Sequence, residues 1–189
     1  PSRLQGTLLH ADAGPGVVRA YRPQRSGAGF RAQVEVLLWS EKDDWFRPID
    51  VVVAPDGSLI VADWFDPGVG GHRMDDVEGG RLYRLAPGGS HYKMPHLDLE
   101  SSEGLQAALA SANPARRFLA YQTLSRAVDA GHTSLVEEMF SSGSTWLRAR
   151  SLWLASRQAE LGTRLALEAA RTDSPALRAL AVRVLSRLG

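Results

Sequence analysis

The chain of 189 residues contains no cysteine. Disulfide frameworks, thiolate metal sites and covalent haem attachment are therefore excluded within it, and its redox compartment is left open. Lysine is nearly absent as well, since Lys42 and Lys93 are the only lysines among 22 basic residues. This bias indicates either arginine–carboxylate pairs, which the planar guanidinium favours, or simply an arginine-rich genome, the plainer explanation.

Long apolar runs are also missing. No stretch approaches the roughly 20 apolar residues that a helix needs to cross a bilayer, so we expect no membrane span. The first residues, Pro1 to Gly6, are neither a signal peptide nor a normal start, and we expect the chain to be part of a longer protein. Its composition, 44% hydrophobic and 23% charged with a net charge of +1, is typical of a globular protein.

Strand-like segments fill the first half of the chain. Two apolar runs, Leu8–Asp12 and Leu59–Asp63, each end in Ala-Asp and are each followed by a glycine-bearing loop. Pro55–Ser58 combines Pro, Asp and Gly in the order of a tight hairpin turn. Alternating or continuous apolar residues predict further strands, with a turn over residues 22–29 between two of them; these strands span residues 16–21, 30–39, 49–54 and 81–85.

The two Ala-Asp runs define a repeat of the size of a β-propeller blade. Aligning Asp12 with Asp63 gives the last three strands of one blade and the first three of the next. The missing fourth strand of the second blade would come from elsewhere in the protein, with His91–Met94 as a weaker local candidate. An open sheet edge is therefore expected here, one that must be paired or covered.

Helical periodicity replaces strand periodicity in the second half. Pro114, Thr145 and Pro175 recur at steps of 31 and 30 residues, which is typical of stacked helix pairs in a HEAT-like α-solenoid. Three residues after each of these positions stands an arginine, namely Arg117, Arg148 and Arg178. Six residues after each stands a small residue that allows close helix approach, namely Ala120, Ser151 and Ala181. We expect the arginines to pair with carboxylates or carbonyls of the next repeat rather than to form a ligand-binding row.

These patterns predict an α+β protein in two segregated parts. Residues 1–98 would form about two partial antiparallel β-propeller blades, and residues 99–189 an α-solenoid of HEAT-like helix pairs. Arginines in the helical part are mixed with glutamate and lack interleaved aromatic residues, so no nucleic acid partner is expected.

One rim of the predicted blades gathers acidic residues. Because successive antiparallel strands alternate in direction, the connections at residues 40–47 and 63–76 must emerge on the same face. The second connection is longer than a hairpin needs, which favours a functional role. Its carboxylates would be oxygen ligands for Ca²⁺, and these are Asp63, Asp66, Asp75 and Asp76. Its histidine, His72, would be a catalytic base or a ligand. The candidate cofactor-binding residues are Arg47, Trp64 and Arg73.

A structural alternative applies to the same residue types. Aspartates at strand ends commonly accept backbone N–H bonds and so cap turns. We favour this interpretation for Asp12, Asp50 and Asp56. For the connection at residues 63–76, the capping and functional interpretations stay equally open.

Residues 45–67, together with Gly70-Gly71-His72 and Gly80–Arg84, resemble the last blades of bacterial membrane-bound dehydrogenases. The propeller of that family is similar to those of soluble quinoprotein sugar dehydrogenases and sorbosone dehydrogenases, and it is followed by HEAT-like helices. The resemblance implies pyrroloquinoline quinone with Ca²⁺, a sugar or alcohol substrate, and a periplasmic or secreted location. The catalytic histidine of such enzymes matches no position in this chain.

Two functions follow. In the first, the chain is the C-terminal part of a dehydrogenase-like propeller protein and serves mainly as a scaffold or protein-interaction module. Its partner would be another protein or the remainder of its own propeller. In the second, it directly contributes Ca²⁺ and quinone-site residues to a periplasmic oxidoreductase that depends on pyrroloquinoline quinone.

Overall fold

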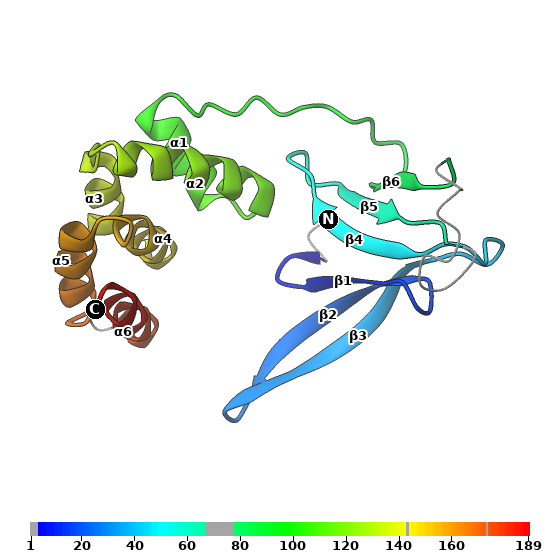
Figure 1. The fold of residues 1–189 in the computed structure, drawn as a ribbon, viewed down its shortest axis with the longest axis horizontal. Helices are drawn as coiled ribbons and strands as arrows, with labels where there is room; N and C mark the ends of the chain where they lie inside the picture. The colour runs from blue at the N-terminus through cyan, green and yellow to red at the C-terminus, as the bar shows by residue number, and fades with distance from the viewer. Residues whose placement is uncertain (1–3, 67–77, 143, 173) are drawn as a thin grey trace. The chain divides into compact units, whose positions relative to one another are not determined.

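The computed structural model describes residues 4–66, 78–142, 144–172 and 174–189. The chain divides into two compact units, Pro1–Pro95 and His96–Gly189. Two antiparallel three-stranded sheets make up the first unit and six helices the second, so the fold is α+β with segregated parts (Figure 1). Within the described residues, no helix combines the length and the apolar character that crossing a membrane requires.

The first sheet has the strand order β1-β2-β3. Its strands confirm the predicted segments, and they are β1 (Leu8–Asp12), β2 (Val17–Ser26) and β3 (Gly29–Trp39). The predicted turn over residues 22–29 is wrong, because β2 continues to Ser26 and pairs with β3 along its whole length. Only Gly27 and Ala28 form the loop.

The long hairpin is explained by its turn and by the position of its proline. Gly27 has φ +60° while Ala28 does not have a positive φ, which is the pattern of a type II′ two-residue hairpin loop. Such a loop makes Ser26 and Gly29 a hydrogen-bonded pair, and the pair types alternate from there. Pro23, opposite Ala32, then falls at a non-hydrogen-bonded position where its missing N–H costs no ladder bond.

The second sheet has the order β4-β5-β6 and confirms the predicted hairpin. Its turn closes with hydrogen bonds between Ala54 and Ser58, and Gly57 has φ +88°. The weaker strand candidate, His91–Met94, is wrong: this described segment forms neither strand nor helix. The strands are β4 (Pro48–Val53), β5 (Leu59–Asp63) and β6 (Arg81–Leu85).

The two sheets share a small apolar core. Val18 from β2, Phe46 from the connection before β4, and Val61 from β5 are almost fully buried. Partly buried side chains from both sheets pack around them, namely Leu38, Val51, Tyr83 and Leu85. One face of each sheet is therefore committed to this contact.

Gly16 lies at the turn between β1 and β2, where the first sheet meets the chain leading into β4. Its φ is +64°, and an added Cβ would lie 2.8 Å from the Phe46 carbonyl oxygen. We expect Gly16→Ala to lower the free energy of unfolding of this unit by about 2 kcal/mol or more, combining the left-handed backbone cost with the clash.

The matched control for this variant is Gly27→Ala. Gly27 also has a positive φ, but an added Cβ there meets nothing within 4 Å. Its substitution should cost only the backbone component, about 1 kcal/mol. Denaturant unfolding of both variants measures the difference, and equal losses would show that the contact with Phe46 has no energetic weight.

The helical unit consists of three consecutive helix pairs. Asn113, Ser144 and Ser174 cap the second helix of each pair by accepting backbone N–H bonds. The predicted starts at residues 114, 145 and 175 are confirmed. In order the helices are α1 (Ser102–Ala110), α2 (Pro114–Asp129), α3 (Ser134–Ser141), α4 (Thr145–Ala155), α5 (Ala159–Ala169) and α6 (Pro175–Leu188).

The small residues of the predicted register lie in the core between the second helices. Ala120, Ser151 and Ala181 are all fully buried, and α4 contacts both α2 and α6. Arg117 and Arg178 cap carbonyls, but not those of the next repeat as expected, and the Arg148 guanidinium lies over the Phe140 ring. Arg117 donates to the Ser111 and Ala112 carbonyl oxygens, and Arg178 donates to that of Thr172. Each thus binds the segment that immediately precedes its own helix.

Candidate functional site

The structure brings residues 40–47 and the residues after β5 together at one end of the second sheet, as the strand directions predict. The backbone N–H of Trp64 donates to the Arg47 carbonyl oxygen at 2.9 Å. Asp43 and Asp63 both bind Arg81, the first residue of β6. We call Asp43, Arg47, Asp63 and Arg81 the rim cluster.

Asp63 is the centre of the rim cluster. Its side chain is fully buried, and its Oδ1 accepts the backbone N–H bonds of Arg47 at 2.8 Å and Phe65 at 3.0 Å. Its Oδ2 accepts from Arg81 Nε at 2.9 Å and from Arg81 Nη2 at 2.6 Å. Four N–H donors thus satisfy a carboxylate that would otherwise be very costly to bury.

Arg81 extends the cluster outward. Its Nη2 also donates to Asp43 Oδ2, and this bond holds the pKa of the Asp43 carboxyl below its usual range. The guanidinium carbon lies 4.7 Å from the centre of the Phe65 ring and 5.5 Å from that of Tyr83. The same cation therefore joins two carboxylates and two aromatic rings.

Phe65 has an unusual backbone. It has φ +50°, the one positive φ of a non-glycine residue in the described part of the chain. A side chain at Gly79 would collide with the Phe65 ring, so glycine is required there for steric reasons. Residues 63–66 and 78–81 are thereby held together by Asp63, Phe65, Gly79 and Arg81.

The predicted cofactor-site residues are only partly placed by the structure. Trp64 is 57% exposed, Asp66 is buried, and the half-buried Arg47 donates from Nη1 to the Phe46 carbonyl oxygen. Arg47 belongs to the rim cluster, and Trp64 is hydrogen-bonded to it through the backbone. The remaining candidates lie outside the described residues: His72, Arg73, Asp75 and Asp76.

The donor set of the described residues does not fit a Ca²⁺ cage. Since all four donors of Asp63 come from the protein itself, a cation at Asp63 would have to displace Arg81. Within the ranges that the structure describes, no three His, Asp or Glu side chains are grouped as a metal site would need. Any cation chemistry would therefore depend on residues beyond Asp63.

The aspartates assigned to turns differ among themselves. Asp56 accepts from the Ser58 hydroxyl and backbone N–H, which lowers its pKa to about 2, and Asp50 accepts from the Val51 N–H. Asp56 confirms the capping interpretation, whereas Asp50 lies inside β4 and caps no turn. For Asp12 that interpretation stays a prediction, and its carboxylate forms an ion pair with Arg19 on the neighbouring strand.

Arg81 is the residue that the sequence interpretation missed. The signal for it was present in the register of the second sheet, because Asp63 and Arg81 are direct cross-strand partners. A carboxylate and a guanidinium at opposed positions of antiparallel strands are expected to pair. The long connection between the two strands does not by itself determine that register.

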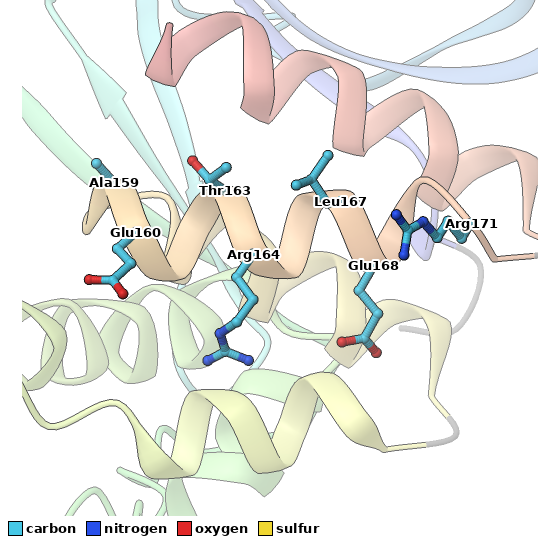
Figure 2. Close-up of a pocket in the computed structure, with 7 residues that line it drawn as sticks. All are labelled: Ala159, Glu160, Thr163, Arg164, Leu167, Glu168 and Arg171. Atoms are coloured by element: carbon cyan, nitrogen blue, oxygen red, sulfur yellow. The ribbon is translucent and has the colours of Figure 1, made fainter.

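The helical unit contains a shallow hollow on the exposed side of α5 (Figure 2). In the figure Arg164 points toward α3, where it pairs with Glu137. Because the hollow is lined by α5 and by Arg171 just after its end, with no second element among the described residues facing it, we assign it no ligand. The lining consists of Ala159, Glu160, Thr163, Arg164, Leu167, Glu168 and Arg171.

The fold and the rim cluster define an α+β protein with paired antiparallel sheets and a separate set of helix pairs. Residues 1–87, which contain both sheets, match a family model described as "Domain of unknown function (DUF7133)". Neither the curated proteins nor the solved structures gave a match to the chain.

Proposed function

We propose that this chain is a scaffold or protein-interaction module whose two sheets are members of a larger, propeller-type stack of sheets. The observation that carries the proposal is the apolar character of the outer face of each sheet, the face turned away from the shared core. The bacterial membrane-bound dehydrogenase resemblance supports a periplasmic or secreted parent protein, with the helix pairs as a HEAT-like arm.

The outer face of the second sheet is formed by alternate residues of its three strands. Val52 on β4 and Leu82 on β6 are 50% and 76% exposed. Their cross-strand partners on β5 are Ile60 and Ala62. Four apolar side chains thus lie together on this face, beside the polar residues Asp50 and Arg84, where a sheet facing water would be mostly polar.

The first sheet also has an apolar row on its outer face, beside His10 and the Asp12–Arg19 ion pair. The row Leu8, Tyr21 and Val34 crosses all three strands on the outer face, and Leu8 and Val34 are 63% and 54% exposed. The opposite face contains Val18 and Ala20, which are fully buried.

Exposed apolar rows on the face turned away from the core are expected where a further sheet covers that face. The shared core of this chain shows one such contact already made. The two outer faces would then bind further sheets of the same kind, supplied by the remainder of the propeller.

The outer faces can be tested directly with the double variant Val36→Lys and Leu82→Lys. We expect the chain without substitutions, called the parent chain, to bind a hydrophobic dye and to self-associate in size-exclusion chromatography with light scattering. The double variant should lose more than half of both signals, because it places a charge on each outer face. Its sheet unit should unfold at about the same temperature, since both residues are exposed surface positions.

Val182→Lys provides the matched control, because Val182 is 64% exposed but lies on α6 in the helical unit. It should leave dye binding and self-association unchanged. A monomeric parent chain that binds no dye, or an equal loss in the control, would contradict the proposal.

The second candidate function is a direct contribution to a quinone-dependent oxidoreductase acting on a sugar or alcohol. It is favoured by Asp66, a buried carboxylate three residues after Asp63 in the chain. In this role Asp66 would be a Ca²⁺ ligand together with Asp75 and Asp76. When bound, Ca²⁺ and pyrroloquinoline quinone would supply the electrophile that accepts the substrate's hydride.

Thermal unfolding in a Ca²⁺ titration tests this second function without requiring activity. At about one hundred times Kd a ligand that binds only the folded state adds about 2.7 kcal/mol of stability. We expect that gain with Ca²⁺ in the parent chain and in Asp50→Asn, but not in Asp66→Asn. No shift in the parent chain, or an equal shift with Mg²⁺, would rule out a specific calcium site.

A further inference from the structure

The end of the β2–β3 hairpin extends beyond the rest of the first sheet (Figure 1). β1 pairs with β2 only as far as Tyr21, so residues 22–33 form a ribbon of two strands, here called the distal ribbon. All residues of β3 from Gly29 to Val36 are exposed, including Phe30 at 71%. An isolated two-stranded ribbon is at best marginally stable in water, which indicates that a partner covers it.

The charge of the distal ribbon has one sign. Residues 13–34 contain no Asp or Glu, while the distal ribbon itself contains Arg22, Arg25 and Arg31. Arg22 lies 3.9 Å from Glu35 in a partly exposed ion pair. Within the described part of the chain, Arg25 and Arg31 form no ion pair. A partner of complementary charge is therefore acidic.

The distal ribbon also offers a free strand edge. β3 is the last strand of its sheet among the described residues, and it contains neither proline nor lysine. Since Gly29 forms a hydrogen-bonded pair with Ser26, the alternation turns the backbone groups of Phe30, Ala32 and Val34 toward the open edge. Natural proteins usually block such an edge, and one left open is suited to accept a further strand.

The edge strand β6 of the second sheet does not offer the same site. β6 is five residues long, against eleven for β3. Arg81 and Arg84 of β6 are both occupied in ion pairs, with Asp63 and Asp56 among their partners. Of the described edge strands β3 and β6, only β3 combines length, an open edge and arginines without an ionic partner.

We propose that the distal ribbon binds an extended acidic segment of a partner protein, which adds a strand to the open edge of β3. Backbone bonds from Phe30, Ala32 and Val34 would fix its register. Alternate side chains of the added strand would contact the apolar face at Phe30 and the arginines of the ribbon. The proposal rests on the interaction function above but uses the backbone edge of β3, whereas the stacking of sheets uses the outer face that Val34 and Phe30 share.

Fluorescence anisotropy with a labelled peptide tests the proposal. The probe is a peptide of about ten residues that alternates valine and glutamate, and its counterpart alternates valine and lysine. We expect the full chain to bind the first at least tenfold more tightly than the second, and to lose affinity as salt rises from low to high concentration.

Two variants separate the backbone and charge contributions. Ala32→Pro removes an N–H that points outward and no bond within the sheet, so it should abolish peptide binding while thermal unfolding stays unchanged. Ala32→Ser retains the N–H and should bind like the parent chain. Arg25→Glu combined with Arg31→Glu should weaken binding at least tenfold, whereas Arg183→Glu on α6 should not.

Equal binding of both peptides, or full binding by Ala32→Pro, would overturn the proposal. The same holds if duplex DNA or vesicles with anionic lipid bind the ribbon while the acidic peptide does not. Loss of self-association in the double variant Val36→Lys and Leu82→Lys tests the proposed stacking of the outer faces and not the binding of the peptide. Peptide binding that persists in that variant would show that the two surfaces act separately.

Discussion

Asp63→Ala is expected to lower the free energy of unfolding of the sheet unit by about 3 to 5 kcal/mol, the range for breaking a buried ion pair. The substitution leaves the backbone N–H groups of Arg47 and Phe65 without an acceptor and removes one carboxylate from Arg81. It also releases the contact between the start of β4 and the end of β5. Denaturant unfolding followed by tryptophan fluorescence measures the loss.

Asp43→Ala provides the control within the same cluster. Asp43 also binds Arg81, but its side chain is 25% exposed whereas that of Asp63 is fully buried. Its removal should cost less than about 1 kcal/mol, as for surface ion pairs. If the two variants lost similar stability, the stabilising role of Asp63 would lie in its charge alone and not in its buried acceptor geometry.

The same cluster determines the expected response to acid. The pKa of Asp43 is lowered in the folded state by its bond to Arg81, so the folded state binds a proton less readily than the unfolded chain. The stability from this bond is therefore present above the ordinary carboxyl pKa and is lost as the pH falls through the lowered folded-state value. Asp43→Asn should remove that part of the pH dependence.

Local sequence signals were sufficient for most elements. The hairpin at Pro55–Ser58 and the helix starts at Pro114 and Pro175 follow from residues whose own backbone preferences define a turn or a cap. The prediction of the β2–β3 turn over residues 22–29 was wrong for the same reason, because Pro23 by its own backbone preference suggests a turn. Its tolerance inside a strand depends on pairing with Ala32, which sequence order alone does not reveal.

The candidate site was harder to predict because its bonds join distant residues. Asp12 and Asp63 follow the same Ala-Asp pattern, yet one forms an ion pair with Arg19 and the other accepts two backbone N–H groups. The difference comes from the chain before β4, which passes beside Asp63. The repeat in the sequence thus marks equivalent strands but not equivalent roles for their final residues.

The largest effect in the helical unit is expected for Phe140→Ala. Phe140 on α3 is 1% exposed and belongs to the core that joins all six helices. The Arg148 guanidinium carbon also lies 5.2 Å from the centre of its ring. Truncation should lower the free energy of unfolding by about 3 to 5 kcal/mol, because it leaves a cavity in a close-packed core and removes the aromatic partner of Arg148.

Phe118→Ala tests whether burial is the cause. Phe118 is on α2 of the same unit but is 60% exposed, so the same truncation should change stability by less than about 0.5 kcal/mol. Far-UV circular dichroism during denaturant unfolding follows the helices in both variants. Equal losses would mean that Phe118 is covered in solution, which would identify α2 as a contact surface and the helix pairs as part of the interaction module.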